Sequence, residues 1–251
     1  MILTAVLAAT LAAQAVPAPK LGIPPEVFKC ELDKGAESSI CRALAAQKGK
    51  RWADAAAEFE GAASSLKPDD VRGSRLLAAA GNMWIAANQP GKAALALDRA
   101  LAGKGLVAEQ HGEALLDRAR AAEAQGDLKT ARAKVQQAAA AMSADPFYWY
   151  FSAALAVREE DVPTAKLAIA RALTLAPNDP AVLFEAGHVA NLAGEEAKAR
   201  DYWTRAATAD PKGASGQAAK RALGLLTVPL TVSATPTPAK PVPNNAGGTE
   251  K

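Results

Sequence analysis

Residues 180–211, PAVLFEAGHVANLAGEEAKARDYWTRAATADP, decide the fold of this chain. Apolar and small residues recur three and four positions apart, both before and after Gly194, and this spacing predicts two amphipathic helices. Pro211 follows the second helix, and proline cannot continue the helical hydrogen-bond ladder. The stretch therefore predicts one helical hairpin.

The same pattern recurs along the chain with a spacing of 34 residues, apart from a slightly longer connection before the third copy. One hairpin cannot bury its apolar stripe alone, so the copies are expected to stack on each other. Small and large residues fall at equivalent places in the five copies: Ala55, Phe59, Ala62 and Pro68; Leu77, Gly81, Trp84, Ala93, Leu97 and Ala100; Leu115, Ala119, Ala122, Gly126, Ala131, Val135 and Ala138; Trp149, Ala153, Ala156, Ala165, Ile169, Ala172 and Pro177; Leu183, Gly187, Ala190, Gly194, Ala199, Trp203, Ala206 and Pro211.

These residues resemble the tetratricopeptide repeat (TPR), in which small residues alternate with large packing residues along two helices and a proline closes the repeat. The resemblance covers about five repeats, and it departs from the family where alanine replaces an aromatic residue in the first helix of three copies. It implies an all-α fold, an α-solenoid of about five TPR helical hairpins with a C-terminal capping helix and a disordered Pro-rich tail.

The chain is expected to divide into five parts. They are a signal peptide over 1–15, an irregular N-terminal segment over 16–35, the TPR array over 36–213, a capping helix over 214–226 and a disordered Pro/Thr/Gly-rich tail over 227–251. The tail has too few large apolar residues to bury a core.

The first residues have the pattern of an export signal. A short uncharged apolar run ends at the small-x-small site Ala13-Gln14-Ala15, so we expect cleavage after Ala15 and a periplasmic or secreted location. The alternative is a buried N-terminal helix. This run is too short to cross a membrane, and no other stretch in the sequence is expected to span one.

Two cysteines, Cys30 and Cys41, lie beside the first hairpin. An even cysteine count in an exported chain suggests a disulfide, and this bridge would tie the irregular segment to the first helix. Free thiols are the alternative.

The composition argues against several classes of function. The net charge of +3 is spread over the chain without a Lys/Arg block, so we expect no nucleic-acid partner. The two histidines, His111 and His188, are far apart and lack the spacing of metal ligands. No Gly-rich phosphate loop or nucleophile elbow is present, so we expect neither an enzyme nor a cofactor.

The TPR resemblance implies where a partner would bind. In the family, ligand contacts come from the first helix of each hairpin, on the concave face. Carried over residue by residue, the partner-binding groove comprises Arg75, Asn82, Glu113, Arg120, Glu123, Phe147, Tyr150, Arg158, Phe184, His188 and Asn191. The implied function is a scaffold for a protein or peptide of the cell envelope, and the alternative is a module that binds cell-wall glycan or a small ligand through its aromatic half.

Within this groove, Tyr150 and Phe184 are the expected apolar anchors, although they could instead only pack the hairpins. Arg120 and Arg158 flank them, which slightly favours an acidic partner segment. A clamp for a terminal carboxylate is not expected, because Asp117 stands where such a clamp has asparagine.

Overall fold

The computed structural model describes residues 35–226, and these form eleven α-helices without a β-strand. Ten helices pair as five successive hairpins: α1 (Ala36–Lys48) with α2 (Trp52–Ser65), α3 (Arg72–Ala86) with α4 (Pro90–Ala102), α5 (Ala108–Ala124) with α6 (Leu128–Met142), α7 (Pro146–Arg158) with α8 (Val162–Leu175), and α9 (Pro180–Leu192) with α10 (Glu196–Ala209). The last helix, α11 (Ala214–Leu226), packs on α9 and α10. The expected all-α solenoid is confirmed. The signal peptide, most of the irregular segment and the tail lie outside the described residues.

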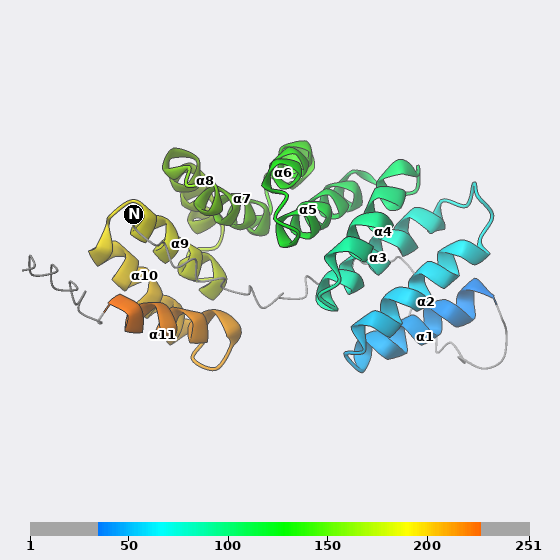
Figure 1. Cartoon of the computed structure of the whole chain (residues 1–251), viewed down its shortest axis with the longest axis horizontal. Coiled ribbons are helices and arrows are strands. Elements are labelled where there is room, and N and C mark those ends of the chain that lie inside the picture. The colour runs from blue at the N-terminus through cyan, green and yellow to red at the C-terminus, as the bar shows by residue number, and fades with distance from the viewer. Residues whose placement is uncertain (1–34, 227–251) are drawn as a thin grey trace, which may run out of the picture.

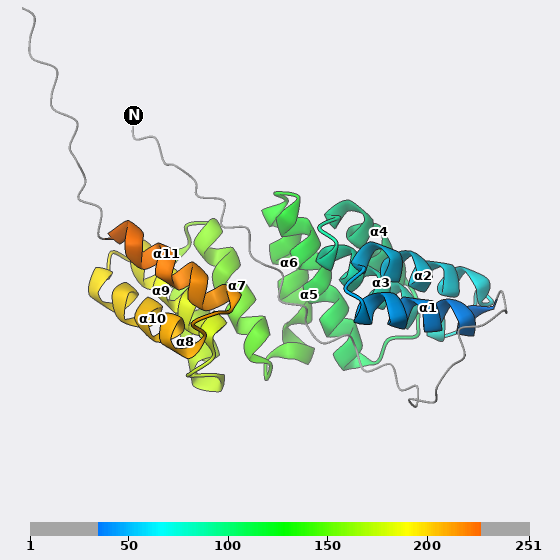
Figure 2. The ribbon, with the colours of Figure 1, turned by 90° about the horizontal axis from the view of Figure 1, so that it is seen from below.

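The hairpins stack into an arch. We call the first helix of each hairpin the A helix and the second the B helix. Figure 1 shows the B helices α4, α6 and α8 along the outer side of the arch and the A helices α3, α5 and α7 along the inner side. Figure 2 turns the arch so that it is seen from its open side. The arch therefore places A-helix side chains from successive hairpins on one common face.

Aspartates begin four consecutive helices. The side chains of Asp127 and Asp161 accept a hydrogen bond from a backbone N–H in the first turn of α6 and α8. Asp145 and Asp179 do the same for α7 and α9, and each is followed by a proline at the first helical position. Both devices favour a helix start, since they satisfy or remove N–H groups that have no partner in the helix. The Asp-Pro pairs thus mark where A helices begin.

The turn inside each hairpin contains one residue with positive φ. These residues are Lys50, Asn88, Gly126, Glu160 and Gly194. The spacing between successive members of this set is 38 residues up to Gly126 and 34 residues after it. The sequence pattern predicted one longer connection, whereas the structure has two longer periods. Part of the difference lies in the A helices, since α3 and α5 have 15 and 17 residues against 13 in α7 and α9.

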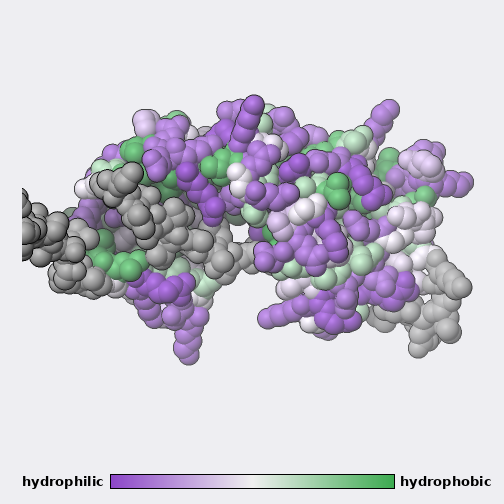
Figure 3. Space-filling view, viewed as in Figure 1, coloured by the Kyte–Doolittle hydropathy of each residue, from purple (hydrophilic) through white to green (hydrophobic). Residues whose placement is uncertain are grey.

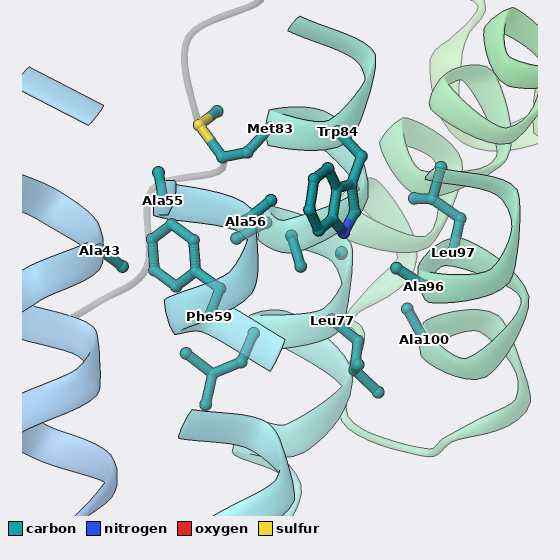
Figure 4. Packing of buried hydrophobic residues seen from close by; sticks show 14 of the residues in the cluster. Ala43, Ala55, Ala56, Phe59, Leu77, Met83, Trp84, Ala96, Leu97 and Ala100 are labelled. Carbon is teal, nitrogen blue, oxygen red and sulfur yellow. The ribbon is translucent and has the colours of Figure 1, made fainter. Parts of the chain in front are cut away.

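The core of each hairpin joins a small A-helix residue to a larger B-helix residue. A Cβ atom on Gly81 would lie 2.4 Å from Leu97 Cγ, and one on Gly187 would lie 2.2 Å from Trp203 Nε1. In the other hairpins alanine occupies the A-helix position. The corresponding buried pairs are Ala43 with Phe59, Ala119 with Val135, and Ala153 with Ile169. Figure 4 shows the Phe59 ring directed toward Ala43 in the first of these pairs. The glycines are therefore required by the close approach of a bulky partner.

Candidate binding site on the inner helices

Polar side chains on α3, α5 and α7 link three successive hairpins through a hydrogen bond and an ion pair, and a further polar pair lies on α9. We call them the inner polar chain, and it comprises Asn82, Asp117, Arg120, Glu123, Arg158, Glu185 and His188. Three aromatic residues, Phe147, Tyr150 and Phe184, lie on the same A helices. This arrangement is unusual for a helical solenoid core, because buried charged groups are costly unless they are paired and hydrogen-bonded.

The link between α3 and α5 is fully hydrogen-bonded. Asn82 Nδ2 donates to Asp117 Oδ2 at 2.8 Å, and Arg120 Nη1 donates to Asp117 Oδ1 at 2.9 Å. Asn82 is 4% exposed and Asp117 is 9% exposed. Because each carboxylate oxygen of Asp117 has a donor, this aspartate is compensated inside the fold.

The link between α5 and α7 is less complete. The Arg120 guanidinium lies 5.8 Å from the centroid of the Phe147 ring, within the range of a cation–π contact. Arg158 Nε lies 2.7 Å from Glu123 Oε1. Its N–H does not point at that oxygen, however, and the buried Oε1 has no hydrogen-bond partner among the described residues. Glu123 therefore has a positive charge nearby, on Arg158, but its Oε1 accepts no hydrogen bond from the described residues.

The pKa of Glu123 follows from this setting. Burial raises its pKa above the ordinary value for glutamate, and the nearby charge of Glu185 raises it further. Arg158 and Arg120 act in the opposite direction without cancelling the rise. The ionised form of Glu123 is thus incompletely compensated in the folded chain.

Tyr150 connects this region to α9. Burial raises the pKa of its hydroxyl, and the charges of Glu185 and Glu123 add to the rise. Glu185 is only 3% exposed, and its Oε2 lies 3.4 Å from His188 Nδ1. The His188 ring in turn meets Phe184 edge-on, with the ring centroids 4.3 Å apart. Tyr150 is therefore close to two buried carboxylates on different A helices.

The remaining predicted groove residues lie at or beyond the ends of this region. Arg75 is used inside the fold, since its Nε donates to the carbonyl of Gly105 at 3.0 Å and so holds the α4–α5 connection. Glu113 is half-buried in α5, and its pKa is raised by burial and by the carboxylates of Glu109, Asp117 and Asp145. Asn191 is exposed near the end of α9. The structure thus gathers most of the predicted set, but not Arg75.

The predicted disulfide has one member in the described chain. Cys41 lies on α1 and is 8% exposed, whereas Cys30 lies outside the described residues. The bridge stays a prediction.

Sequence reasoning missed two members of the inner polar chain, Asp117 and Glu185, as site residues. The signal was a charged residue inside a stripe of buried positions on each A helix. Reasoning from the sequence also treated Arg120 and Arg158 as available to an acidic partner. In the structure Arg120 is paired with Asp117 and Arg158 with Glu123, so the arginines are already engaged.

The surface seen in Figure 3 is mainly hydrophilic, with hydrophobic residues in small patches. Among residues 35–226, no group of three or more potential ligands could hold a metal ion. No helix in this range is both long and apolar enough to cross a membrane.

Several solved structures share this fold. PilW, a widely conserved type IV pilus biogenesis factor, is 20% identical with a TM-score of 0.60, over 73% of this chain and 82% of its own. PilF of Pseudomonas aeruginosa is 15% identical with a TM-score of 0.59, over 75% and 82%. YrrB, a TPR protein with an unusual peptide-binding site, is 17% identical with a TM-score of 0.54, over 75% and 93%.

No protein-family model and no curated protein matches the sequence. The solved structures nevertheless have the helical-hairpin repeat that the sequence pattern predicted. The chain therefore has the tetratricopeptide-repeat fold, with five hairpins followed by α11 in the range 35–226.

Proposed function

We propose that this chain is a periplasmic or secreted scaffold that holds a protein or peptide of the cell envelope against its A helices. The observation that carries the proposal is the inner polar chain. It places incompletely compensated charge beside the half-buried rings of Phe147, Tyr150 and Phe184, on one face built from successive hairpins. Aromatic rings supply rigid contact area, and polar groups beside them give a binding surface its specificity.

Two further observations support this proposal. The TPR fold is shared with YrrB, whose structure is described as having a peptide-binding site. The export signal expected over 1–15 supports a location outside the cytoplasm. Since the same fold hosts many different partners, the partner must be identified by its contacts with this face.

Photo-cross-linking tests the face directly. A photoreactive amino acid at Phe184 or Asn191 on α9 would report the inner side. The same group at Leu167 on α8, which is 63% exposed, is the matched control on a B helix. Cross-linking in cells should join the α9 positions to one defined segment of an envelope protein, and the Leu167 position should not capture that segment.

Three outcomes would change the interpretation. Equal capture of the same proteins from Leu167 and from the α9 positions would contradict a specific inner binding face. Recovery of cell-wall fragments without a stoichiometric protein would instead favour the glycan-binding alternative. A Tyr150→Ala/Phe184→Ala double variant that folds and still captures the partner would show that these two rings are not its anchors.

A further inference from the structure

The inner face carries more carboxylates than guanidinium groups. Its carboxylates are Glu113, Asp117, Glu123 and Glu185, whereas its arginines are Arg120 and Arg158. Asp117 accepts hydrogen bonds from both Arg120 and Asn82. Apart from Glu113, the carboxylates that remain are Glu123 and Glu185, and the charges of both act on Tyr150.

Glu123 is the least satisfied of these carboxylates. Its side chain is 9% exposed, and Oε1 is buried without a hydrogen-bond partner among the described residues. Arg158, its ion-pair neighbour, is 41% exposed and approaches without directing its N–H at Oε1. Buried polar atoms in folded proteins nearly always have a donor or acceptor. Glu123 thus has an unused acceptor, and an exposed arginine occupies the approach to it.

We propose that a lysine or arginine side chain of the bound partner replaces Arg158 at Glu123. This inference rests on the proposed function, because it names the chemistry of the segment that the inner face holds. The incoming cation would donate to Glu123, and Glu185 would be the second carboxylate near it. Its aliphatic stem would lie against Tyr150, as the stems of long basic side chains commonly do on apolar surface. Arg158 would swing into solvent, toward which it is already exposed.

Charge complementarity decides the choice of partner. An acidic segment would have to draw Arg120 or Arg158 away from buried carboxylates, which would leave those carboxylates unpaired. A basic segment keeps a cation beside Glu123 and adds the hydrogen bond that Oε1 lacks, and a charge-assisted hydrogen bond to a carboxylate is about twice as strong as a neutral one. The occupant is therefore a basic peptide segment of a protein partner.

Selection from a random peptide library displayed on phage, using the full chain as bait, tests this inference. We expect enriched peptides to share a lysine or arginine flanked by apolar residues. For a synthetic peptide of the enriched sequence, Glu123→Gln should weaken binding at least about tenfold, because a hydrogen bond to a charged group is lost. Arg158→Gln should tighten binding about two- to fivefold, since it removes the partly exposed arginine that competes for Glu123.

Arg200→Gln is the matched control, because Arg200 is a comparably exposed arginine, at 44%, that pairs with Glu196 on α10. It should leave the affinity unchanged. If Glu123→Gln does not fold, Glu185→Gln and the sign of the Arg158→Gln effect still decide the matter. Enriched acidic peptides, or weaker binding by Arg158→Gln, would overturn the basic-segment inference while leaving the scaffold function intact. Failure to enrich any peptide over a Tyr150→Ala/Phe184→Ala bait would instead count against peptide binding itself.

Discussion

The close contact between Gly187 and Trp203 provides a sharp test of how the hairpins are packed. Trp203 is 3% exposed, and its Nε1 donates to the carbonyl of Phe184 at 3.0 Å. A Cβ on Gly187 would lie 2.2 Å from Nε1 and 2.3 Å from Cδ1 of the Trp203 ring. We therefore expect the effect of Gly187→Ala to depend on the residue at position 203.

The magnitudes follow from volume. Trp203→Ala should lower the free energy of unfolding by about 3–5 kcal/mol, because buried contacts are lost and a cavity remains. Gly187→Ala should cost about 1–3 kcal/mol through overpacking, partly offset by about 1 kcal/mol of helix propensity. Trp203→Ile leaves space beside position 187, and the methyl group added by Gly187→Ala would fill it. The double variant would then have the same alanine–isoleucine pair as Ala153 and Ile169 in the preceding hairpin. In the Trp203→Ile background, Gly187→Ala should stabilise the chain.

Urea unfolding followed by circular dichroism measures these variants, and hydrogen exchange locates the effect. Because repeats are stabilised mainly by nearest neighbours, exchange after Trp203→Ala should rise first in α9, α10 and α11. If Gly187→Ala destabilises the chain equally with and without the Trp203→Ile substitution, the size-matching argument is refuted. Uniform loosening from α1 to α11 would refute the modular one.

Three other predictions concern pH, the turns and the exported chain. Burial raises the pKa of Glu123, so its ionised form destabilises the folded chain as pH rises through that pKa. Glu123→Gln should therefore raise the melting temperature near pH 7. This gain should shrink as the pH is lowered through the titration of Glu123. Gly194 has φ 74° and open space around its Cβ direction, so Gly194→Ala should cost about 1–2 kcal/mol in urea unfolding, whereas Glu160→Gly, at φ 57°, should be neutral or stabilising. Mass spectrometry of unreduced exported protein should show Val16 at the N-terminus and the loss of two hydrogens at Cys30 and Cys41, and alkylation of both thiols would contradict the bridge.

The repeat made the fold predictable from the sequence. Side chains at equivalent positions must fill the same space in every hairpin, so the small residue at Gly187 and the large one at Trp203 had to recur in phase. The starts of α7 and α9 have an equally local cause, because the Asp caps that precede their first-turn prolines act within one turn. The two 38-residue periods were harder to see, since the longer A helices α3 and α5 absorb part of the extra length.

The site was less predictable, because charge pairing depends on which residues of neighbouring hairpins come together. The phase of the repeat placed Arg120 and Arg158 on the inner face, but it could not show that each meets a carboxylate. The pair formed by Asn82 and Asp117 is likewise set by how α3 packs beside α5. Local periodicity fixes the face on which a side chain lies, whereas the stacking of hairpins decides its partner.

Comparison of equivalent positions within the chain shows that the fold itself does not require the buried acids. Asp117 and Glu185 occupy the A-helix position that holds Ala79 in α3 and Phe151 in α7, both buried and apolar. The solenoid therefore accepts apolar residues at this place, and well-packed apolar residues commonly match or exceed the stability of buried ion pairs. Asp117 has two donors from its own chain, whereas the contact described for Glu185 is between its Oε2 and His188 Nδ1, at 3.4 Å. Under the proposed basic-segment binding, a cation placed between Glu123 and Glu185 would supply the donor that Glu123 Oε1 lacks.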